Sequence, residues 1–318
     1  MIENVLGVVK NNFIPKNKED RVCMPNGKEI LFKSFLVSNV VYNICKFEKA
    51  KGELINNEDL EKWDQNKVDS YLNKFDLIVL FSNKFKKLRG FMKNKKKNFL
   101  YLEQPVIYRN PNVTIKYQSY FRILYQNIYG EKFIQKYCNQ SIRKGFPKVK
   151  QKKIKTSGDS ILLINQLSGD LAISPTDPYE WSKKIISKIR SIENRKIIFR
   201  DHPLQKKNNG VIFKEILKNT NVEISENKTL FDDLIRSSLV VTYSSTSALE
   251  SIQNSIPTIA TNNRSFVYEI VKNDVLNPPY SNISEQNYDN LMSAISNTHY
   301  NLHELISGSF WLNFKSFM

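Results

Sequence analysis

Short apolar segments rich in β-branched residues alternate with amphipathic segments along the second half of the chain. The amphipathic segments carry apolar residues at the spacing of a helix, and the short segments have the length of buried strands. Alternation of strand and helix favours a parallel sheet covered on both faces by helices. The predicted strands are 160–166, 196–203, 222–226, 239–245 and 257–262, and the predicted helices are 174–192, 209–219, 229–238 and 245–255.

The first half of the chain has a less regular pattern. Apolar segments at 4–10, 29–47, 75–82 and 98–105 support a second, similar α/β sheet. The pattern over 120–138 predicts a helix.

A change in composition separates the two halves. Residues 141–160 are rich in Lys, Gly, Ser and Pro and lack apolar periodicity, which predicts a linker. The chain has 318 residues, more than one hydrophobic core usually holds. We therefore expect an α/β protein with two domains, 1–150 and 151–318. No apolar run approaches the ~20 residues that span a bilayer, and the first residues lack the apolar stretch of a signal peptide, so we expect a cytoplasmic protein.

The net charge of +17 is unevenly distributed along the sequence. Residues 1–150 hold 29 Lys and Arg against 14 Asp and Glu, whereas residues 151–318 hold 19 against 17. This contrast predicts that the first domain meets an anionic partner.

Three loops that follow predicted strands carry the candidate chemistry, because ligands of parallel sheets bind beyond the carboxyl ends of the strands. These loops are 165–170, 200–203 and 243–247. The turn YSSTS at 243–247 precedes a predicted helix, so its hydroxyls and free N–H groups can hold a phosphate. His202 can donate to a second phosphate oxygen, and the carboxylate of Glu250 suits the two hydroxyls of a ribose. The predicted nucleotide site comprises Gln166, Ser168, Gly169, Arg200, His202, Pro203, Ser244, Ser245, Thr246 and Glu250.

These residues also have purely structural interpretations. A Ser or Thr before a helix is most often a cap. His202 before Pro203 fits an ordinary turn, and Glu250 alone is an exposed helix residue. Their joint occurrence at strand ends in β-α-β order favours the nucleotide site.

The sequence RDHP at 200–203, followed by LVVTYSSTSALESIQNSIPTIA at 239–260, resembles the HP and SS motifs of a known family. This family comprises bacterial capsule and surface-polysaccharide glycosyltransferases of the GT-B fold, including enzymes that transfer Kdo or sialic acid from CMP-sugars. The resemblance covers roughly residues 158–275 and implies two Rossmann-like domains that face a central cleft. It also implies that His202, Ser244 and Ser245 contact the donor nucleotide. Asn254 and Ser255 depart from the pattern, because many relatives have a glycine there.

The resemblance also implies a reaction without a bound metal or cofactor, since GT-B transferases usually need none. The Asp-x-Asp triplet that holds the metal of GT-A enzymes does not occur in this sequence. The nucleotide sugar is then a substrate, and His202 together with Arg200 or Lys206 would neutralise the charge of the departing nucleotide.

An inverting transfer needs a base that takes a proton from the acceptor. Glu103 is the best catalytic candidate beside His202, because it follows a predicted strand and lies among aromatic residues that can raise its pKa. Asp76 and Glu131 are weaker candidates. The structural alternative pairs Glu103 with an arginine, either Arg109 or Arg122.

The densest basic stretch is KFKKLRGFMKNKKKNFLY at 84–101, in which aromatic residues are interleaved. A solvated surface is its simplest interpretation. The functional interpretations are contact with anionic lipid, where each cation contributes ~1 kcal/mol, and contact with a nucleic-acid backbone. The candidate acceptor-binding or anion-binding residues are Lys93, Lys95, Lys96, Lys97, Arg109 and Arg122.

These observations predict a glycosyltransferase of the hexosyl-, sialyl- or Kdo-transferring kind. Its acceptor would be an anionic or lipid-linked glycan, with peripheral contact at the inner membrane face. The alternatives are a phage-type transferase that glycosylates DNA bases and a non-catalytic module that binds nucleotides or nucleic acid on the same fold.

Overall fold

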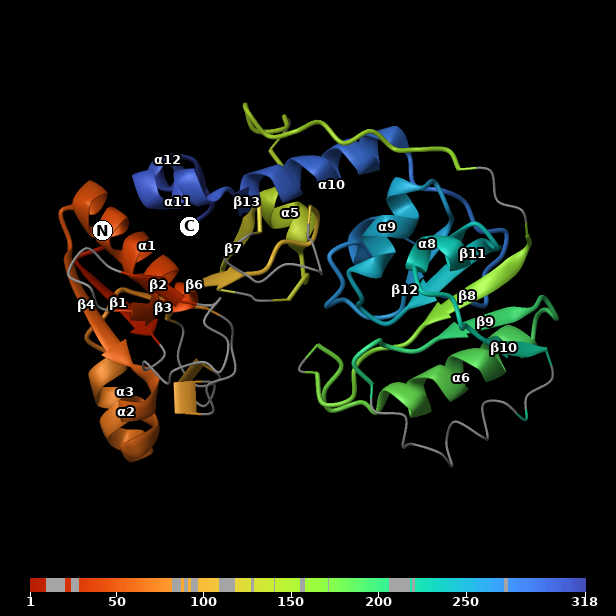
Figure 1. Ribbon diagram of the computed structural model, residues 1–318, viewed down its shortest axis with the longest axis horizontal. Coiled ribbons are helices and arrows are strands. Elements are labelled where there is room, and N and C mark those ends of the chain that lie inside the picture. The colour runs from red at the N-terminus through yellow and green to blue at the C-terminus, as the bar shows by residue number, and fades with distance from the viewer. Residues whose placement is uncertain are drawn as a thin grey trace. The chain divides into compact units, whose positions relative to one another are not determined.

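The computed structural model describes most of the chain, and its residues form two compact units (Figure 1). Unit 1 consists of Met1–Ile128 and Ile295–Met318, and unit 2 of Tyr129–Ala294. The sequence placed the division at 150/151 instead. The described residues are 1–9, 21–23, 29–81, 87–88, 91–92, 97–108, 118–126, 129–139, 141–154, 158–170, 172–205, 218, 221–271 and 274–318.

Unit 2 contains a five-stranded sheet in the order β10-β9-β8-β11-β12, and every pairing within it is parallel. This arrangement confirms the α/β class that the alternating pattern predicted. The predicted helix at 209–219 lies outside the described residues, apart from Lys218. The elements are β8 (Ser160–Ile164), α6 (Pro178–Arg190), β9 (Ile197–Arg200), β10 (Val222–Ile224), α8 (Leu230–Leu234), β11 (Ser237–Thr242), α9 (Ser247–Gln253), β12 (Thr258–Ala260) and η3 (Tyr268–Ile270).

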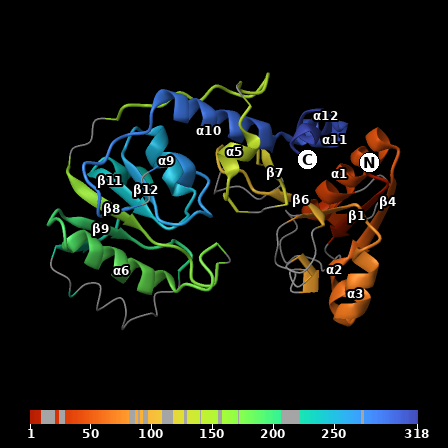
Figure 2. The ribbon, with the colours of Figure 1, turned by 180° about the vertical axis from the view of Figure 1, so that it is seen from behind.

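Helices cover both faces of the unit 2 sheet. Alternate residues of β8 point to opposite faces, so Ile161 and Leu163 pack with the buried side of α6, while Leu162 and Ile164 pack with Leu234 of α8. Figure 1 shows α6 on one side of this sheet, with α8 and α9 on the other, and Figure 2 shows α6 and α9 from behind. A sheet buried on both faces needs continuous apolar strands, as the sequence has.

Two local features of unit 2 follow directly from sequence signals. Asp177 caps α6 by accepting from the N–H groups of Tyr179 (2.9 Å) and Glu180 (3.1 Å), and Pro178 takes the first helical turn. After α9, Ser255 has a φ of +56°. This left-handed conformation favours glycine, the residue that the resembling transferases often have here.

Residues 141–160 do not form a linker between the units, contrary to the sequence prediction. They lie within unit 2, where Phe146 is buried. The backbone N–H of Lys152 donates to the carbonyl of Gln253 (2.7 Å), and the Gln151 amide donates to the carbonyl of Ile252 (2.8 Å). These hydrogen bonds hold residues 151–152 against the end of α9.

Unit 1 contains a six-stranded sheet in the order β13-β7-β6-β5-β1-β4. The pairs from β4 to β6 are parallel, whereas β7 is antiparallel to β6 and to β13. A separate antiparallel pair joins β2 (Arg21–Cys23) and β3 (Glu29–Leu31). The sheet strands are β1 (Asn4–Val9), β4 (Lys51–Asn56), β5 (Leu77–Phe81), β6 (Asn98–Glu103), β7 (Phe121–Tyr125) and β13 (His299–Tyr300).

The helix predicted over 120–138 is wrong in its first part. Residues 121–125 form β7, whose five side chains are all buried, and only Phe133–Tyr137 are helical, as α5. The apolar residues of FRILY match a helical spacing, but burial on both faces between β6 and β13 stabilises a strand. The segment 29–47 is mainly α1 (Phe32–Glu48), which packs against β1, β4 and β5. Two shorter helices are α2 (Asn57–Lys62) and α3 (Gln65–Leu72).

The chain returns to unit 1 at Ile295, within α10 (Glu285–Thr298), and adds β13, α11 (Leu302–Ser307), α12 (Ser309–Phe314) and η4 (Lys315–Phe317). The Asn43 amide of α1 donates to the carbonyls of Leu305 and Ile306, both at 3.0 Å. The Trp311 indole donates to Glu48 (2.8 Å). Gly308 turns the chain between α11 and α12 with a φ of +81°, and a Cβ there would lie 2.8 Å from Asn43. This segment is therefore a packed part of unit 1.

Candidate functional site

The strand order of unit 2 reverses between β8 and β11. From β8, the chain continues to β9 and β10 on one side, and then returns to β11 and β12 on the other. In open parallel sheets, ligands bind at the carboxyl ends of the strands where this reversal occurs. We call this edge of the unit 2 sheet, residues 165–169, 201–205 and 243–246, the rim. The structure therefore brings together the three loops that the sequence singled out.

Gln166 joins the two strands on either side of the reversal. Its side chain is buried, and its amide donates to the hydroxyl of Ser244 (3.1 Å). With the amide turned over, its oxygen accepts from the N–H groups of Ser245 (2.8 Å) and Ser244 (3.2 Å) and from the Ser244 hydroxyl. The second orientation fits better, because it satisfies the backbone donors of the turn. Gln166 therefore holds the Ser244–Ser245 turn in place.

The rest of the serine turn faces the solvent more openly. Ser245 is half-buried, and its hydroxyl accepts from the N–H of Ser247 (3.2 Å), at the first residue of α9. Thr246 is exposed, and its side chain makes no capping hydrogen bond. The hydroxyls of Ser245 and Thr246 thus lie at the start of α9 beside the rim.

His202 lies in a tight turn directly after β9. Its carbonyl accepts from the N–H of Gln205 (2.8 Å), and its Nδ1 accepts from the N–H of Leu204 (3.2 Å). An acceptor at Nδ1 places the proton of the neutral imidazole on Nε2. The ring of His202 can therefore donate a hydrogen bond from Nε2. Pro203 follows it on the surface.

Ser168 and Gly169 form the exposed turn after β8. The Ser168 N–H donates to the side-chain oxygen of Gln205 (3.0 Å), which ties the loop after β8 to the loop after β9. Gly169 has a φ of +78°, which a side chain would strain.

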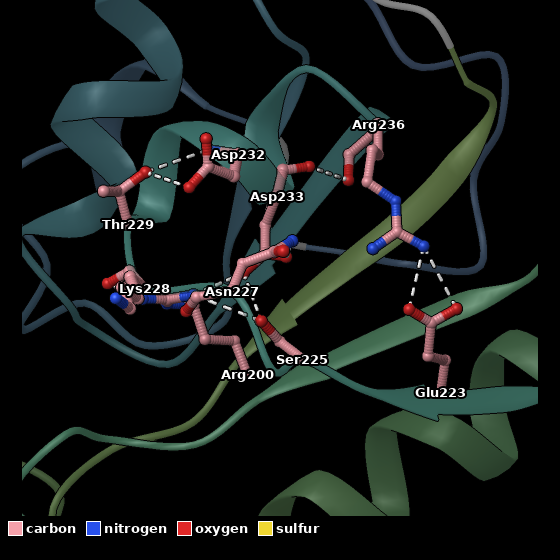
Figure 3. A network of polar contacts seen from close by, with 10 residues as sticks. Arg200, Glu223, Ser225, Asn227, Lys228, Thr229, Asp232, Asp233 and Arg236 are labelled. Carbon is pink, nitrogen blue, oxygen red and sulfur yellow. Dashed lines mark hydrogen bonds and ion pairs between the residues drawn. The ribbon is translucent and has the colours of Figure 1, made fainter.

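Arg200 has a different place from the one predicted for it, although it ends β9. Its guanidinium donates to the fully buried carboxylate of Asp233 (2.5 Å), the hydroxyl of Ser225 (3.1 Å) and the carbonyl of Asn227 (3.0 Å) (Figure 3). Ser225 and the Asn227 amide donate to the same carboxylate, at 2.6 and 2.7 Å. This network fixes the loop after β10 and engages one terminal nitrogen of the Arg200 guanidinium in three hydrogen bonds.

Glu250 has an exposed side chain on α9, one turn after Thr246. Within the described part of the chain, its carboxylate makes no hydrogen bond or ion pair. Desolvation by the surrounding protein atoms raises the pKa of Glu250, and the positive charge of Arg200 opposes that rise. A carboxylate that reaches water but is partly desolvated is suited to accept hydrogen bonds from a ligand.

The sequence did not single out Asp201, Asn165 and Tyr179, which form a hydrogen-bonded group beneath the rim. The Asp201 carboxylate accepts from the Asn165 amide (3.1 Å), the Tyr179 hydroxyl (2.5 Å) and the N–H of His202 (2.9 Å). The sequence signal that could have identified this group is Asp201 itself, an acidic residue between a strand and the His202–Pro203 pair.

The candidate base in unit 1 lies at the carboxyl end of β6. Glu103 pairs in register with the buried Arg122 of β7, and Arg122 pairs on its other side with His299 of β13. Directly opposed residues have Cβ atoms ~5 Å apart, so this register also suits the structural alternative, a Glu103–Arg122 pair. Arg109 lies outside the described residues.

The weaker candidates have other surroundings. Asp76 precedes β5 and accepts from the N–H groups of Glu3 and Asn4, both at 2.9 Å. Burial raises the pKa of Asp76, but these hydrogen bonds outweigh it, so the pKa lies below its usual value. A carboxyl group of this kind is a poor base. Glu131 belongs to unit 2.

The basic stretch is only partly described. Lys97 donates to the carbonyls of Asn73 (2.9 Å) and Phe75 (3.1 Å), so its ammonium group stabilises the turn before β5. Lys93, Lys95 and Lys96 lie outside the described residues, as does Lys206.

The division into units changes the distribution of charge that the sequence predicted. Unit 1 holds 24 Lys and Arg against 14 Asp and Glu, and unit 2 holds 24 against 17. The net charges are +10 and +7, where the boundary at 150 had given +15 and +2. The contrast shrinks because residues 129–150, with six basic side chains, belong to unit 2.

No helix in the described ranges is long and apolar enough to cross a membrane. The same residues hold no cluster of three or more His, Cys, Asp or Glu suited to a metal ion.

Comparison with known proteins identifies the fold. No protein-family model and no curated protein sequence matches the chain. Among solved structures, the KpsC β-Kdo 2,7 transferase of Thermosulfurimonas dismutans is similar with a TM-score of 0.54 and 14% identity, covering 99% of both chains. The KpsC β-Kdo 2,4 transferase of the same organism gives 0.44 and 10%, covering 87% of this chain and 95% of that one. MurG of Acinetobacter baumannii gives 0.33 and 9%, covering 98% and 99%. The first likeness shows that the chain has the GT-B type of fold, with two Rossmann-like domains.

Proposed function

We propose that the chain is a glycosyltransferase that binds a nucleotide sugar at the rim of unit 2 and transfers the sugar to a glycan or lipid-linked acceptor. The observation that carries this proposal is the position of Gln166, Ser244 and Ser245 at the reversal of strand order. His202 follows the neighbouring strand on the same edge. Sheets of this topology bind nucleotides at this place. The likeness in fold to a sugar transferase supports the same conclusion.

Each rim residue has a distinct part in the proposed binding. The hydroxyls of Ser245 and Thr246 and the Nε2–H of His202 donate to the phosphate oxygens. The carboxylate of Glu250 accepts from the ribose hydroxyls. Gln166 and Arg200 do not contact the nucleotide in this proposal. Gln166 holds the serine turn, and Arg200 fixes the end of β9. As the sugar departs, fixed donors at the phosphate stabilise the charge that develops on the nucleotide.

The favoured donor is a CMP-sugar, and the favoured process is surface-polysaccharide synthesis. Both inferences rest on the HP and SS motifs at 202–203 and 244–245. The name of the structurally similar KpsC enzyme specifies Kdo transfer, which agrees with this donor class. Glu103 is the proposed base for the acceptor hydroxyl, and the reaction as proposed uses no bound metal.

A thermal-shift screen against CMP, UDP, GDP and ADP tests nucleotide binding. A nucleotide at 100 times its dissociation constant should stabilise the chain by ~2.7 kcal/mol. His202→Ala should abolish that shift and the transfer reaction while leaving the ligand-free melting temperature nearly unchanged. His303→Ala is the matched control, since His303 is exposed on α11 of unit 1. An unchanged shift in the His202 variant would remove the rim from the proposal.

The net charge of +17 favours a second candidate, a transferase acting on DNA. Transfer to free oligosaccharide that is unaffected by added DNA would support the glycan acceptor. Transfer that requires DNA would support the second candidate, and nucleotide binding without any transfer would indicate a non-catalytic module.

A further inference from the structure

The Asp201 carboxylate is a meeting point of three elements of unit 2. One oxygen accepts from the Asn165 amide at the end of β8 (3.1 Å) and from the backbone N–H of His202 (2.9 Å). The other accepts from the Tyr179 hydroxyl in the first turn of α6 (2.5 Å). An ionised carboxylate only accepts hydrogen bonds, and all three partners are donors, so the group is well matched.

The partners of Asp201 are themselves held firmly. Asn165 and Tyr179 are only 1% and 2% exposed. The amide oxygen of Asn165 accepts from the hydroxyl of Ser182 (3.2 Å), a fully buried residue of α6. Burial raises the pKa of Tyr179, and its hydrogen bond to Asp201 adds to the rise, so the hydroxyl stays protonated and remains a donor. The hydrogen-bond partners of the Asp201 carboxylate are therefore held in fixed positions.

Asp201 and these partners hold the turn that carries His202. The backbone of His202 is fixed by Asp201 on one side and by the N–H of Gln205 on the other. Its imidazole is fixed by the N–H of Leu204, which donates to Nδ1. If the first contact is lost, the turn can move, and the Leu204 contact that sets the tautomer is then no longer enforced.

We propose that Asp201 is a positioning residue that aims the Nε2–H of His202 at the rim, by holding the turn at 201–204 against β8 and α6. The role in nucleotide binding rests on the function proposed above, whereas the role in fixing the imidazole does not. Asp201 touches no ligand in this scheme. It acts through His202, as hydrogen-bonded carboxylates do when they orient functional imidazoles.

The first test reads the imidazole directly. The chain has three histidines, so ¹⁵N spectra of the rings are simple, and His202→Gln and His303→Gln variants assign the signals. In the unmodified chain, His202 should be the Nε2–H tautomer. Asp201→Ala should shift its two nitrogen signals toward the average of both tautomers. An unchanged His202 signal in a folded Asp201→Ala chain would overturn the proposal, whether or not any nucleotide binds.

The second test measures titrations of CMP, UDP, GDP and ADP into the full chain. For each nucleotide that binds, Asp201→Ala should weaken binding about tenfold, the order expected when an orienting partner of a functional histidine is removed. Asp201→Asn should stay within about threefold, because its amide oxygen still accepts from His202 and its nitrogen can donate to the Tyr179 oxygen. A loss in Asp201→Asn as large as in Asp201→Ala would overturn the geometric role in favour of a purely electrostatic one.

Two further variants separate the orientation of the His202 imidazole from the stability of the chain. Glu223→Ala is the matched control, because Glu223 of β10 also has several partners, accepting twice from Arg236 (2.8 and 3.1 Å) and pairing with Lys196. Lys196 precedes β9 and Arg236 precedes β11, so this cluster lies at the edge opposite the rim. The Glu223→Ala variant should lose stability and keep its nucleotide affinity.

Tyr179→Phe removes one hydrogen-bond donor to Asp201 and keeps the buried ring, so this variant replaces Asp201→Ala if that chain does not fold. It should move the His202 signals in the same direction, and no movement would overturn the proposal.

Discussion

The sheets of the two units differ in strand direction, and the difference decides where polar side chains gather. In unit 2 all five strands run the same way, so every strand ends at one edge, and Gln166, His202 and Ser244 meet there. In unit 1 one of the six strands, β7, runs opposite to the other five. Glu103 therefore ends its strand opposite Arg122, a residue near the start of β7, rather than beside another loop of the same kind. A parallel sheet concentrates chemistry at an edge, and a mixed sheet divides it.

The largest expected effect comes from breaking the ionic network of unit 2. Asp233→Ala leaves the guanidinium of Arg200 without its buried carboxylate, which should destabilise unit 2 by about 3–5 kcal/mol. Urea titration with hydrogen exchange, followed separately over 129–294 and over the rest, should show the loss in unit 2. Asp232→Ala is the control, because among the described residues its part-exposed carboxylate accepts a hydrogen bond from Thr229 alone. A uniform loss across both units would mean that they do not unfold separately.

The next effect concerns Glu103, the best candidate base in unit 1. Glu103→Gln should lower the transfer rate about 10²-fold while donor affinity stays intact, because the proton of the acceptor hydroxyl then has no base. Rates and nucleotide affinities are measured for this variant and, for comparison, for the weaker candidates as Asp76→Asn and Glu131→Gln. A folded variant with full activity would exclude Glu103 as the base. Loss of folding would favour its structural pairing with Arg122.

A smaller effect is expected from pH at the rim. Only the ionised form of Glu250 accepts from both ribose hydroxyls, so nucleotide affinity should fall about tenfold as the pH drops through its raised pKa. Stability should change in the opposite sense. A carboxyl group whose pKa is raised by folding stabilises the protein below its unfolded pKa and loses that contribution as pH rises through the folded value. Calorimetric titrations and melting curves across this range should show opposite slopes, and both should flatten in Glu250→Gln.

The smallest effect tests whether the remaining charge difference between the units is local. Replacing Lys93, Lys95 and Lys96 by Gln should weaken binding to anionic vesicles or DNA about threefold. Charges act over only ~8 Å at physiological ionic strength, so a local group of lysines contributes more to binding than the net charge of the unit. The control set is Lys10, Lys16 and Lys18. Equal losses from both sets would indicate a diffuse field. Lys97→Gln should affect stability instead, since its ammonium group holds two carbonyls.

Sequence reasoning recovered most of unit 2 because its signals are local. Period, caps and strand-end residues such as Asp177, His202 and Ser244 are each determined by a few neighbours in the chain. Arg200 shows where this stops, since its partner Asp233 is 33 residues away and nothing in RDHP reveals that the guanidinium turns toward α8. The hydrogen bonds of Asp201 with Asn165 and Tyr179 were not predicted for the same reason.

In unit 1 the decisive contacts are longer-range still. Strand β7 pairs with residues 299–300, which follow it by more than 170 positions, so FRILY could be taken for a helix. The structure divides the chain after Ile128, whereas the composition of residues 141–160 predicted a boundary at 150/151. Polar composition marks exposed or irregular backbone, but it does not tell a linker from a segment that lies against α9.

Both ends of the described chain belong to unit 1, so unit 2 is a contiguous insertion within it, and this has a consequence during synthesis. The ribosome makes residues 295–318 only after all of unit 2, so unit 1 lacks β13, α11 and α12 throughout the synthesis of unit 2. Until then the outer edge of β7 carries unpaired backbone groups at Phe121 and Arg122, the kind of edge that recruits strands from other chains. A premature stop after unit 2 would therefore yield a protein with an intact rim and a permanently open, aggregation-prone β7 edge.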